Sequence, residues 1–136
     1  MRWMAADQGE GQTTWEAGSN NAGAINVDVE SQMHDSSSLL ERYRELIALR
    51  NEFPALRDGG IRDYASGNTG VMAYERLTTQ NQVLVVHNHT GKEQTIVLHP
   101  NVESFSYSKI LKAIAVKSTL NSNQLTLPPY STAIVE

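Results

Sequence analysis

The segment from Asp35 to Leu56 (DSSSLLERYRELIALRNEFPAL) constrains the fold most, because it has the strongest helical repeat in the chain. Its apolar residues recur every three or four positions, the spacing of one helix face: Leu39, Leu40, Tyr43, Leu46 and Ile47. Asp35 and Ser36 are candidate N-cap residues, because their side-chain oxygens can accept hydrogen bonds from the first turn. Pro54 should end the helix, since the residue before a proline is disfavoured in the α region. We therefore predict one long helix over residues 35–53.

The apolar sector of this helix is wide. Ala48 and Leu49 extend it beyond a single stripe, and charged residues occupy the other side. A helix that is apolar over such an arc normally contacts two partners. If one of them is missing, the exposed apolar face should promote self-association.

After Gly59 the pattern changes to short strands separated by turn signals. Apolar, β-branched and aromatic residues predict strands over 61–64, 71–77, 82–87, 93–98, 104–109, 113–118, 124–127 and 132–135. The run over 82–87 is apolar enough to be buried on both faces. Residues 88–92 (NHTGK) predict a hairpin turn, with 93–98 as the return strand. Short strands at this spacing are typical of an antiparallel sandwich or barrel.

Residues 1–33 carry little periodic pattern. Glycines and polar residues punctuate the segment, which is the composition of a loop. A loop of this length is uncommon inside a compact domain, so it is either functional or belongs to a part not present. Trp3 and Trp15 are large apolar residues with little local pattern to bury them.

Composition excludes several classes of function. The 136 residues are enough for one domain with a core. A net charge of -4 without a Lys/Arg cluster argues against nucleic-acid binding. The longest apolar runs, such as 83–86, are too short to span a membrane, and the first residues lack the features of a signal peptide. The absence of cysteine excludes a disulfide framework, a thiol nucleophile and a thiolate metal site.

Two further patterns have a structural and a functional interpretation. His87 and His89 share one face of a strand, but no third metal ligand is visible nearby, so we expect partly exposed polar residues and no metal site. Residues 88–90 (Asn-His-Thr) match the N-glycosylation sequon, which matters only in a eukaryotic secretory host. Alternation predicts that most of the four later tyrosines lie in the core: Tyr64, Tyr74, Tyr107 and Tyr130.

Four groups of residues resemble the C-terminal part of glycoside hydrolase family 13, the α-amylase family. Arg2-Trp3 and residues 11–16 (GQTTWE) resemble the loop after the eighth barrel strand. Residues 29–32 (VESQ), with Asp35 and residues 38–40 (SLL), resemble the start of the last barrel helix. Residues 43–51 (YRELIALRN), with 54–56 (PAL) and Gly59, resemble that helix itself, and 127–131 (LPPYS) resemble the last strand of domain C.

The resemblance implies a mainly β chain with one long helix. Residues 1–33 would be a loop from a missing barrel, expected to be poorly ordered. Residues 34–56 would be the final helix of a truncated (β/α)8 barrel. Residues 57–136 would be domain C, an antiparallel Greek-key β-sandwich. The family's catalytic carboxylates lie at the ends of barrel strands upstream, so we expect no catalytic residue here.

The same resemblance places Trp3 and Trp15 near the rim of the parent enzyme's cleft, as candidate substrate-binding residues. Their alternative role, which we favour, is to anchor the loop by hydrophobic burial. Cofactors are not expected in this chain, and any calcium would belong to the parent enzyme. Whether the parent is secreted or cytoplasmic stays open.

The functional expectation is therefore a non-catalytic fragment. Domain C would stabilise the barrel of a parent that hydrolyses α-1,4-glucosidic bonds in starch or maltooligosaccharides with retention. The expected partners are that barrel and, in the parent, an α-glucan, with neither nucleic acid nor membrane. The alternatives are a stand-alone α-glucan-binding module, a parent that is an α-glucosidase or oligo-1,6-glucosidase, and a chain that is itself a hydrolase.

Overall fold

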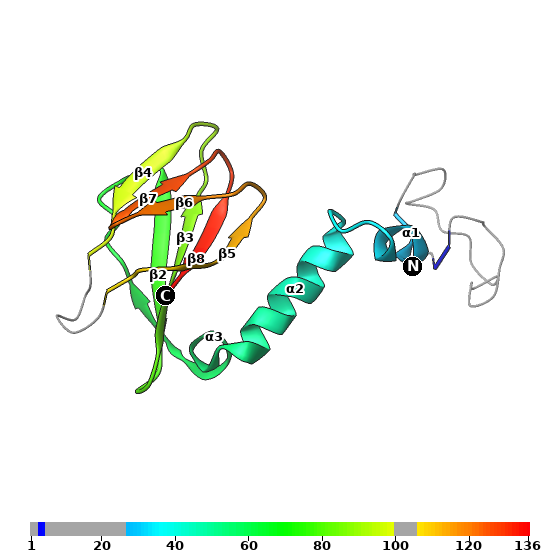
Figure 1. The fold of residues 1–136 in the computed structure, drawn as a ribbon, viewed down its shortest axis with the longest axis horizontal. Helices are drawn as coiled ribbons and strands as arrows, with labels where there is room; N and C mark the ends of the chain where they lie inside the picture. The colour runs from blue at the N-terminus through cyan, green and yellow to red at the C-terminus, as the bar shows by residue number, and fades with distance from the viewer. Residues whose placement is uncertain (1–2, 5–26, 100–105) are drawn as a thin grey trace. The chain divides into compact units, whose positions relative to one another are not determined.

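The computed structural model describes residues 3–4, 27–99 and 106–136 (Figure 1). The chain divides into two compact units. We call Met1–Glu52 the helical unit and Phe53–Glu136 the sandwich unit.

The helical unit contains α1 (Val29–Met33) and α2 (Leu39–Glu52). The predicted long helix is present, but it begins at Leu39 and not near Asp35. Ser38 acts at its start, because the Ser38 Oγ accepts a hydrogen bond from the Glu41 N–H at 3.2 Å. The proposed caps at Asp35 and Ser36 were therefore wrong. The helix ends at Glu52, as predicted from the proline two residues later.

Helix α1 lies inside the segment that we expected to be a loop. It forms because the Asp28 side chain caps its first turn, accepting from the Ser31 N–H at 2.8 Å. Residues 5–26, which make up most of the predicted loop, lie outside the described residues.

The sandwich unit begins with a second short helix, α3 (Pro54–Asp58). The predicted 34–56 helix is thus interrupted at Phe53, whose backbone is extended (φ -104°, ψ 108°), and α3 restarts with proline in its first turn. Gly59 follows because the chain passes too close for a side chain: an added Cβ would lie 2.3 Å from the Ala55 carbonyl oxygen. Helix α3 contacts strands β2 and β3.

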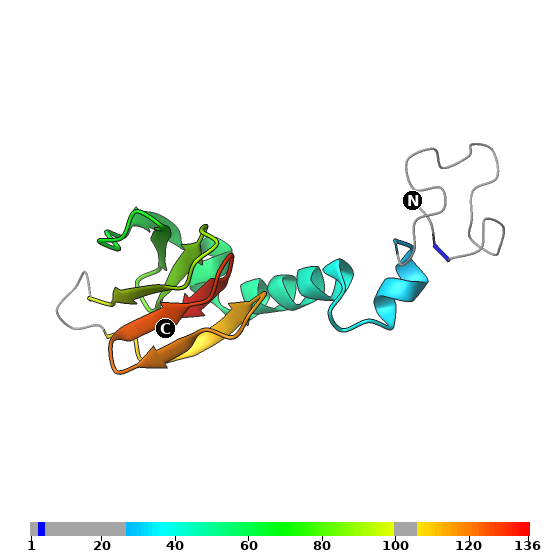
Figure 2. The same cartoon turned by 90° about the horizontal axis from the view of Figure 1, so that it is seen from above.

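Among the described residues, eight strands follow in two antiparallel sheets, which confirms the predicted β-sandwich (Figures 1 and 2). The five-stranded sheet has the order β1-β2-β3-β8-β5, and the three-stranded sheet has the order β4-β7-β6. The strands are β1 (Gly60–Asp63), β2 (Val71–Leu77), β3 (Gln82–Asn88), β4 (Gln94–Val97), β5 (Ile110–Ile114), β6 (Thr119–Asn121), β7 (Gln124–Leu127) and β8 (Thr132–Val135).

The main core lies between the two sheets. Buried side chains from both sheets meet there, including Leu84, Val86 and Val135 from one sheet and Ile96, Leu125 and Leu127 from the other. Strand β3 is buried on both faces, as its composition predicted, because Val83 and Val85 point to the opposite side from Leu84. Helix α3, with its buried Ala55 and Leu56, packs on β2 and β3 and accounts for this second buried face.

Four predictions in the strand region differ from the structure. Residues 106–109, inside the predicted 104–109 strand, are not a strand, and β5 begins earlier than predicted, at Ile110. Strand β6 was not predicted, since only Leu120 in it is apolar. Most importantly, 88–92 is not a hairpin turn: β4 pairs with β7 in the other sheet and not with β3. The chain changes sheet at this point because apolar side chains of β3 and β4 face one another across the core.

Candidate functional site

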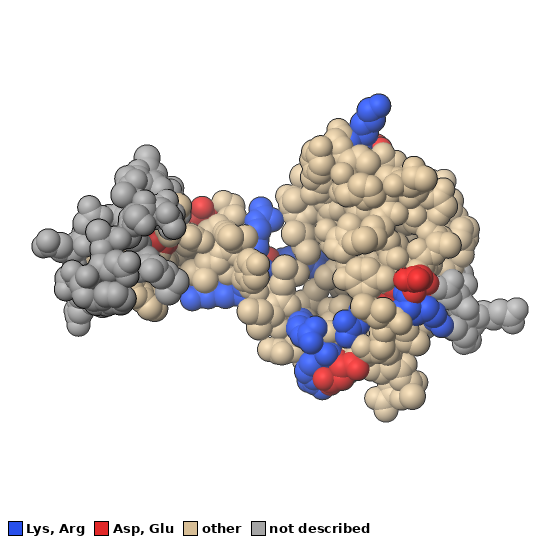
Figure 3. Space-filling view, turned by 180° about the vertical axis from the view of Figure 1, so that it is seen from behind, with Lys and Arg blue, Asp and Glu red and all other residues tan. Residues whose placement is uncertain are grey.

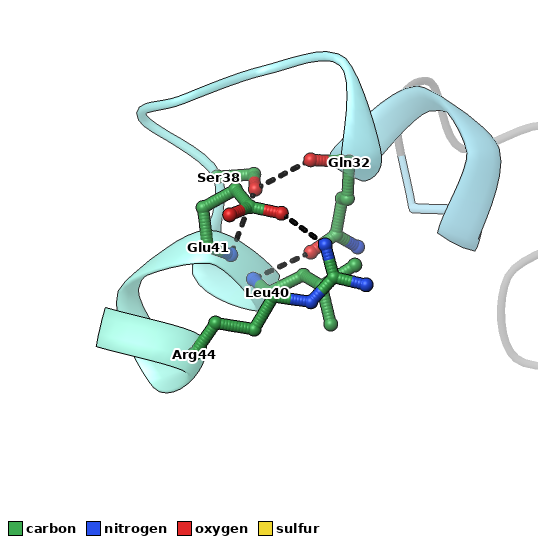
Figure 4. Close-up of polar contacts among 5 residues, drawn as sticks. All are labelled: Gln32, Ser38, Leu40, Glu41 and Arg44. Atoms are coloured by element: carbon green, nitrogen blue, oxygen red, sulfur yellow. Dashed lines mark hydrogen bonds and ion pairs between the residues drawn. The ribbon is translucent and has the colours of Figure 1, made fainter. Parts of the chain in front are cut away.

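Within the described part of the helical unit, the connection between α1 and α2 gathers several polar contacts (Figure 4). We call residues 28–41 the α1–α2 corner. Gln32 accepts twice from the beginning of α2: its carbonyl oxygen from the Ser38 Oγ–H at 2.8 Å, and its Oε1 from the Leu40 N–H at 3.1 Å. Because Ser38 also accepts from the Glu41 N–H, two of the free N–H groups of the first turn of α2 are satisfied.

Acidic side chains complete the corner on both sides. Asp28 is buried, and its carboxylate also accepts from the Ser31 Oγ–H at 2.8 Å. Asp35 accepts from the Ser37 Oγ–H at 2.6 Å and from its N–H at 2.8 Å. The hydrogen bond from the Ser37 hydroxyl, and to a smaller extent the one from the Ser37 N–H, lower the pKa of the Asp35 carboxyl below its ordinary value. The VESQ…D…SLL residues of the family resemblance therefore build this corner.

Of the two predicted substrate-binding residues, the structure describes only Trp3. Its side chain is 48% exposed, and its carbonyl oxygen accepts from the Glu30 N–H in α1 at 2.9 Å. Trp15 lies outside the described residues.

Helix α2 exposes the apolar face that its sequence predicted. Leu39, Tyr43 and Ile47 are 65%, 60% and 55% exposed and follow one another at four-residue spacing. No residue of α2 is fully buried. Arg44 Nη1 donates to Glu41 Oε1 at 2.5 Å, a partly exposed ion pair (Figure 4).

The sandwich unit contains a buried polar cluster that we did not predict. Glu75 on β2 has a fully buried side chain. Its Oε2 accepts from Arg62 Nε at 2.5 Å, and its Oε1 accepts from Gln82 Nε2 at 2.6 Å and from the Tyr107 hydroxyl. We call these four residues the Glu75 cluster. The alternation of β2 places Glu75 on the core side, but its partners lie 7 to 32 positions away, so no local signal reveals them.

Burial changes the acidity of the two core tyrosines. Desolvation and the Glu75 hydrogen bond raise the pKa of Tyr107 far above its ordinary value. Desolvation also raises the pKa of Tyr64, whose hydroxyl accepts from the His99 N–H at 2.7 Å. The two rings pack edge to face with centroids 6.2 Å apart. Both phenols therefore favour the neutral form.

The two histidines of the predicted pair have different environments. His87 is half-buried, with Nδ1 2.8 Å from the Thr132 Oγ and its ring beside Tyr74. Burial lowers the pKa of His87 below its ordinary value. His89 is exposed. Within the residues that the structure describes, no group of three or more His, Cys, Asp or Glu could hold a metal ion.

In the glycosylation sequon, the Asn88 side chain is engaged in hydrogen bonds. Asn88 is 2% exposed, and its Nδ2 donates to the carbonyl oxygens of Lys92, Leu127 and Pro128 at 2.7, 3.2 and 2.8 Å. Its Oδ1 accepts from the N–H and the hydroxyl of Thr90. The amide is thus fully engaged in joining two turns of the sandwich.

Tyrosine burial follows the prediction in part. Tyr64 and Tyr107 belong to the core, and Tyr74 is half-buried. Tyr130 is 70% exposed, in a turn where its backbone is left-handed (φ 50°). Its ring lies over Gly91, where an added Cβ would be 3.2 Å from the Tyr130 hydroxyl oxygen.

The charged surface shows no extended basic region in the view of Figure 3. Most of the visible face of the sandwich unit carries neither sign, and blue and red side chains lie close to one another at its lower edge. Among the described residues, no helix combines the length and apolar composition that a membrane span requires.

Comparison with known proteins supports the family assignment. Residues 71–134 match the family described as the α-amylase SusG C-terminal domain. The chain is 30% identical over 121 residues to neopullulanase 2 of Thermoactinomyces vulgaris. This alignment covers 84% of this chain and 21% of that protein. These matches support a C-terminal domain of an enzyme of the α-amylase family, glycoside hydrolase family 13.

Two further relatives cover the helical unit as well. The chain is 24% identical to α-amylase 3 of Dictyoglomus thermophilum over all of its length and 26% of that protein. The crystal structure of the α-amylase from H. orenii superposes with a TM-score of 0.78 and 29% identity, covering 99% of this chain and 27% of that one. The chain thus spans about a quarter of the length of these relatives. The sandwich unit contains the C-terminal domain of the family.

Proposed function

We propose that this chain is a non-catalytic part of an α-amylase-family enzyme, and that it stabilises the catalytic barrel of its parent. The exposed row Leu39, Tyr43 and Ile47 on α2 carries the proposal. Three large apolar residues on one helix face, each more than half exposed, form a surface that needs a partner. In the parent enzyme, the catalytic barrel of the same polypeptide would cover this surface.

The parent enzyme is proposed to hydrolyse α-1,4-glucosidic bonds with retention, in starch or maltooligosaccharides. Support comes from relatives named α-amylase and neopullulanase, which align with both units of this chain. Retaining hydrolysis needs two carboxyl groups about 5 Å apart. The Glu75 carboxylate is surrounded by hydrogen-bond donors inside the sandwich, so we assign it a structural role and not a role as one of these two carboxyl groups. An α-glucosidase or oligo-1,6-glucosidase parent is the alternative.

Self-association of the purified chain tests the role of α2. We expect its mass by light scattering to rise with concentration, because the apolar row lacks its partner. The double variant Tyr43→Ser/Ile47→Ser should stay monomeric. Glu52→Ser, nine residues and about two and a half turns from Tyr43 and so on the opposite face of α2, is the matched control and should associate like the unsubstituted chain. If the unsubstituted chain remains a monomer at high concentration, the proposed apolar contact surface on α2 is wrong.

Activity and sugar binding test the remaining parts. The purified chain should release no reducing sugar from starch, and a measurable release would show that it is itself a hydrolase. The exposed Tyr130 favours one alternative, an α-glucan-binding module, because an exposed aromatic face can stack on a sugar ring. Titration with maltoheptaose should show no binding at millimolar ligand. Binding that Trp15→Ala or Tyr130→Ala abolishes would support the binding module instead.

A further inference from the structure

Helix α1 cannot be stable on its own. It has five residues, Val29–Met33, and a helix of a single turn does not repay the cost of nucleation. None of its residues is fully buried. Its order must therefore come from hydrogen bonds to the segments around it, and chiefly from α2, which has 14 residues.

Gln32 makes the connection between the two helices. Its carbonyl oxygen and its Oε1 both accept from the beginning of α2, through the Ser38 hydroxyl and the Leu40 N–H (Figure 4). The side-chain bond also satisfies a free N–H of the first turn of α2. Removal of this one acceptor therefore weakens the start of α2 and the attachment of α1 together.

Trp3 is attached to the other end of α1. Its carbonyl oxygen accepts from the Glu30 N–H, a first-turn donor that has no partner within so short a helix. Asp28, the N-cap of the same turn, holds Ser31 through both carboxylate oxygens. The backbone of Trp3 is thus held where the first turn of α1 places it.

We propose that Gln32 is a positioning residue that fixes Trp3 through α1. Hydrogen bonds link α2 to Gln32, the single turn of α1 links Gln32 to Glu30, and the Glu30 N–H donates to the Trp3 carbonyl oxygen. The inference rests on the proposed function only for what Trp3 would contact in the parent enzyme. The position of Trp3 itself can be measured without any substrate.

The geometry requires a hydrogen-bond acceptor in the side chain at position 32. The side chain acts as an acceptor at a helix N-terminus, where a negative charge is favoured. Gln32→Glu should therefore keep the corner intact. Gln32→Met has a similar size and no comparable acceptor, so it should release the corner. A role in packing alone would not separate these two variants in this direction.

Trp3 fluorescence provides the measurement. The chain has two tryptophans, so Trp15→Phe leaves Trp3 as the single emitter. In that background we expect Gln32→Met to lower the anisotropy of Trp3 and to raise its quenching by acrylamide about twofold or more. Gln32→Glu should match the background, and so should Gln80→Met, a control at an exposed glutamine of the sandwich unit.

Amide hydrogen exchange at Leu40 shows whether the corner has opened. Faster exchange at Leu40 in Gln32→Met, together with a more mobile Trp3, supports the proposal. Faster exchange with unchanged Trp3 fluorescence overturns it, as does failure of Gln32→Glu to preserve Trp3. Ser38→Ala, which removes the second corner hydrogen bond, should move both readouts in the same direction as Gln32→Met. Because self-association slows tumbling and raises anisotropy, the variants are compared at a concentration where light scattering gives them the same mass, and self-association itself tests the proposed function separately.

Discussion

Arg62 on β1 and Glu75 on β2 form an ion pair, with Nε 2.5 Å from Oε2, although the glutamate side chain is fully buried. The arginine side chain is 37% exposed, so the charge that has lost its water is the carboxylate. A buried carboxylate is tolerated only when its oxygens are paired and hydrogen-bonded. The sandwich provides this with donors from β1, from β3 and from Tyr107.

Removal of the arginine should destabilise the sandwich. Arg62→Met leaves Glu75 buried without its cation, and we expect the free energy of unfolding to fall by ~3 kcal/mol. Urea denaturation followed by circular dichroism measures this. The double variant Arg62→Met/Glu75→Leu should recover most of the loss. Arg57→Met, at the exposed Arg57–Asp58 pair, is the control and should cost less than ~1 kcal/mol. Equal losses at both arginines would show that burial of the carboxylate does not matter.

Tyr107 should make the sandwich sensitive to alkali. Its pKa is raised in the folded state above its ordinary value of 10.0, so the neutral phenol stabilises the fold. This contribution is fully present below about pH 10 and declines as the pH rises above it. Tyr107→Phe should flatten the alkaline fall of stability in urea melts between about pH 9 and 11. Tyr43→Phe, on exposed α2, should leave that slope unchanged.

His87 should make the sandwich sensitive to acid. Burial lowers its pKa below 6.5 in the folded state, so folding favours the neutral ring. Its contribution is fully present above pH 6.5 and is lost as the pH falls through the folded pKa. His87→Gln should reduce the loss of stability on acidification across this window, measured by thermal melts. The exposed His89→Gln is the control, and an equal effect there would contradict the assignment.

Asn88 should resist glycosylation in the folded chain. Its Nδ2 donates to three carbonyl oxygens, so no hydrogen is free for attachment of a glycan. Folded chain incubated with oligosaccharyltransferase should show no added mass, whereas the unfolded chain should be modified. Asn88→Asp removes the donors and should cost about 1–3 kcal/mol of stability, because buried carbonyls lose their partners. Efficient modification of folded chain would show that this amide is more accessible than its contacts imply.

Helices and strands could be predicted from the sequence where apolar residues recur at a regular spacing. The apolar spacing from Leu39 to Ile47 identified α2, and the ranges of β2, β7 and β8 matched the prediction. Predictions failed where the deciding contact was distant. The segment 88–92 has the composition of a hairpin turn, yet β4 pairs with β7. Packing of side chains across the core, and not the local turn sequence, decides which strand pairs with β4.

The candidate sites divide in the same way. The exposed face of α2 could be predicted, since it needs only the spacing of residues along one helix. Trp3 was named from the sequence as a candidate contact, and the structure adds the hydrogen bond from Glu30. Neither the Glu75 cluster nor the role of Gln32 could be predicted. Each depends on side chains that the sequence separates and the fold brings together.

The sequence by itself determined that the chain is mainly β with one long helix, that this helix ends before Pro54, and that the chain resembles the α-amylase family. These features follow from periodicity, backbone restriction and local motifs, which act over a few residues. Only the tertiary structure decided that α2 begins at Leu39 with Ser38 capping its first turn, that the β3–β4 connection changes sheet, and which donors surround Glu75. Hydrogen-bond and burial requirements are met by groups close in space, and spacing along the chain does not specify them.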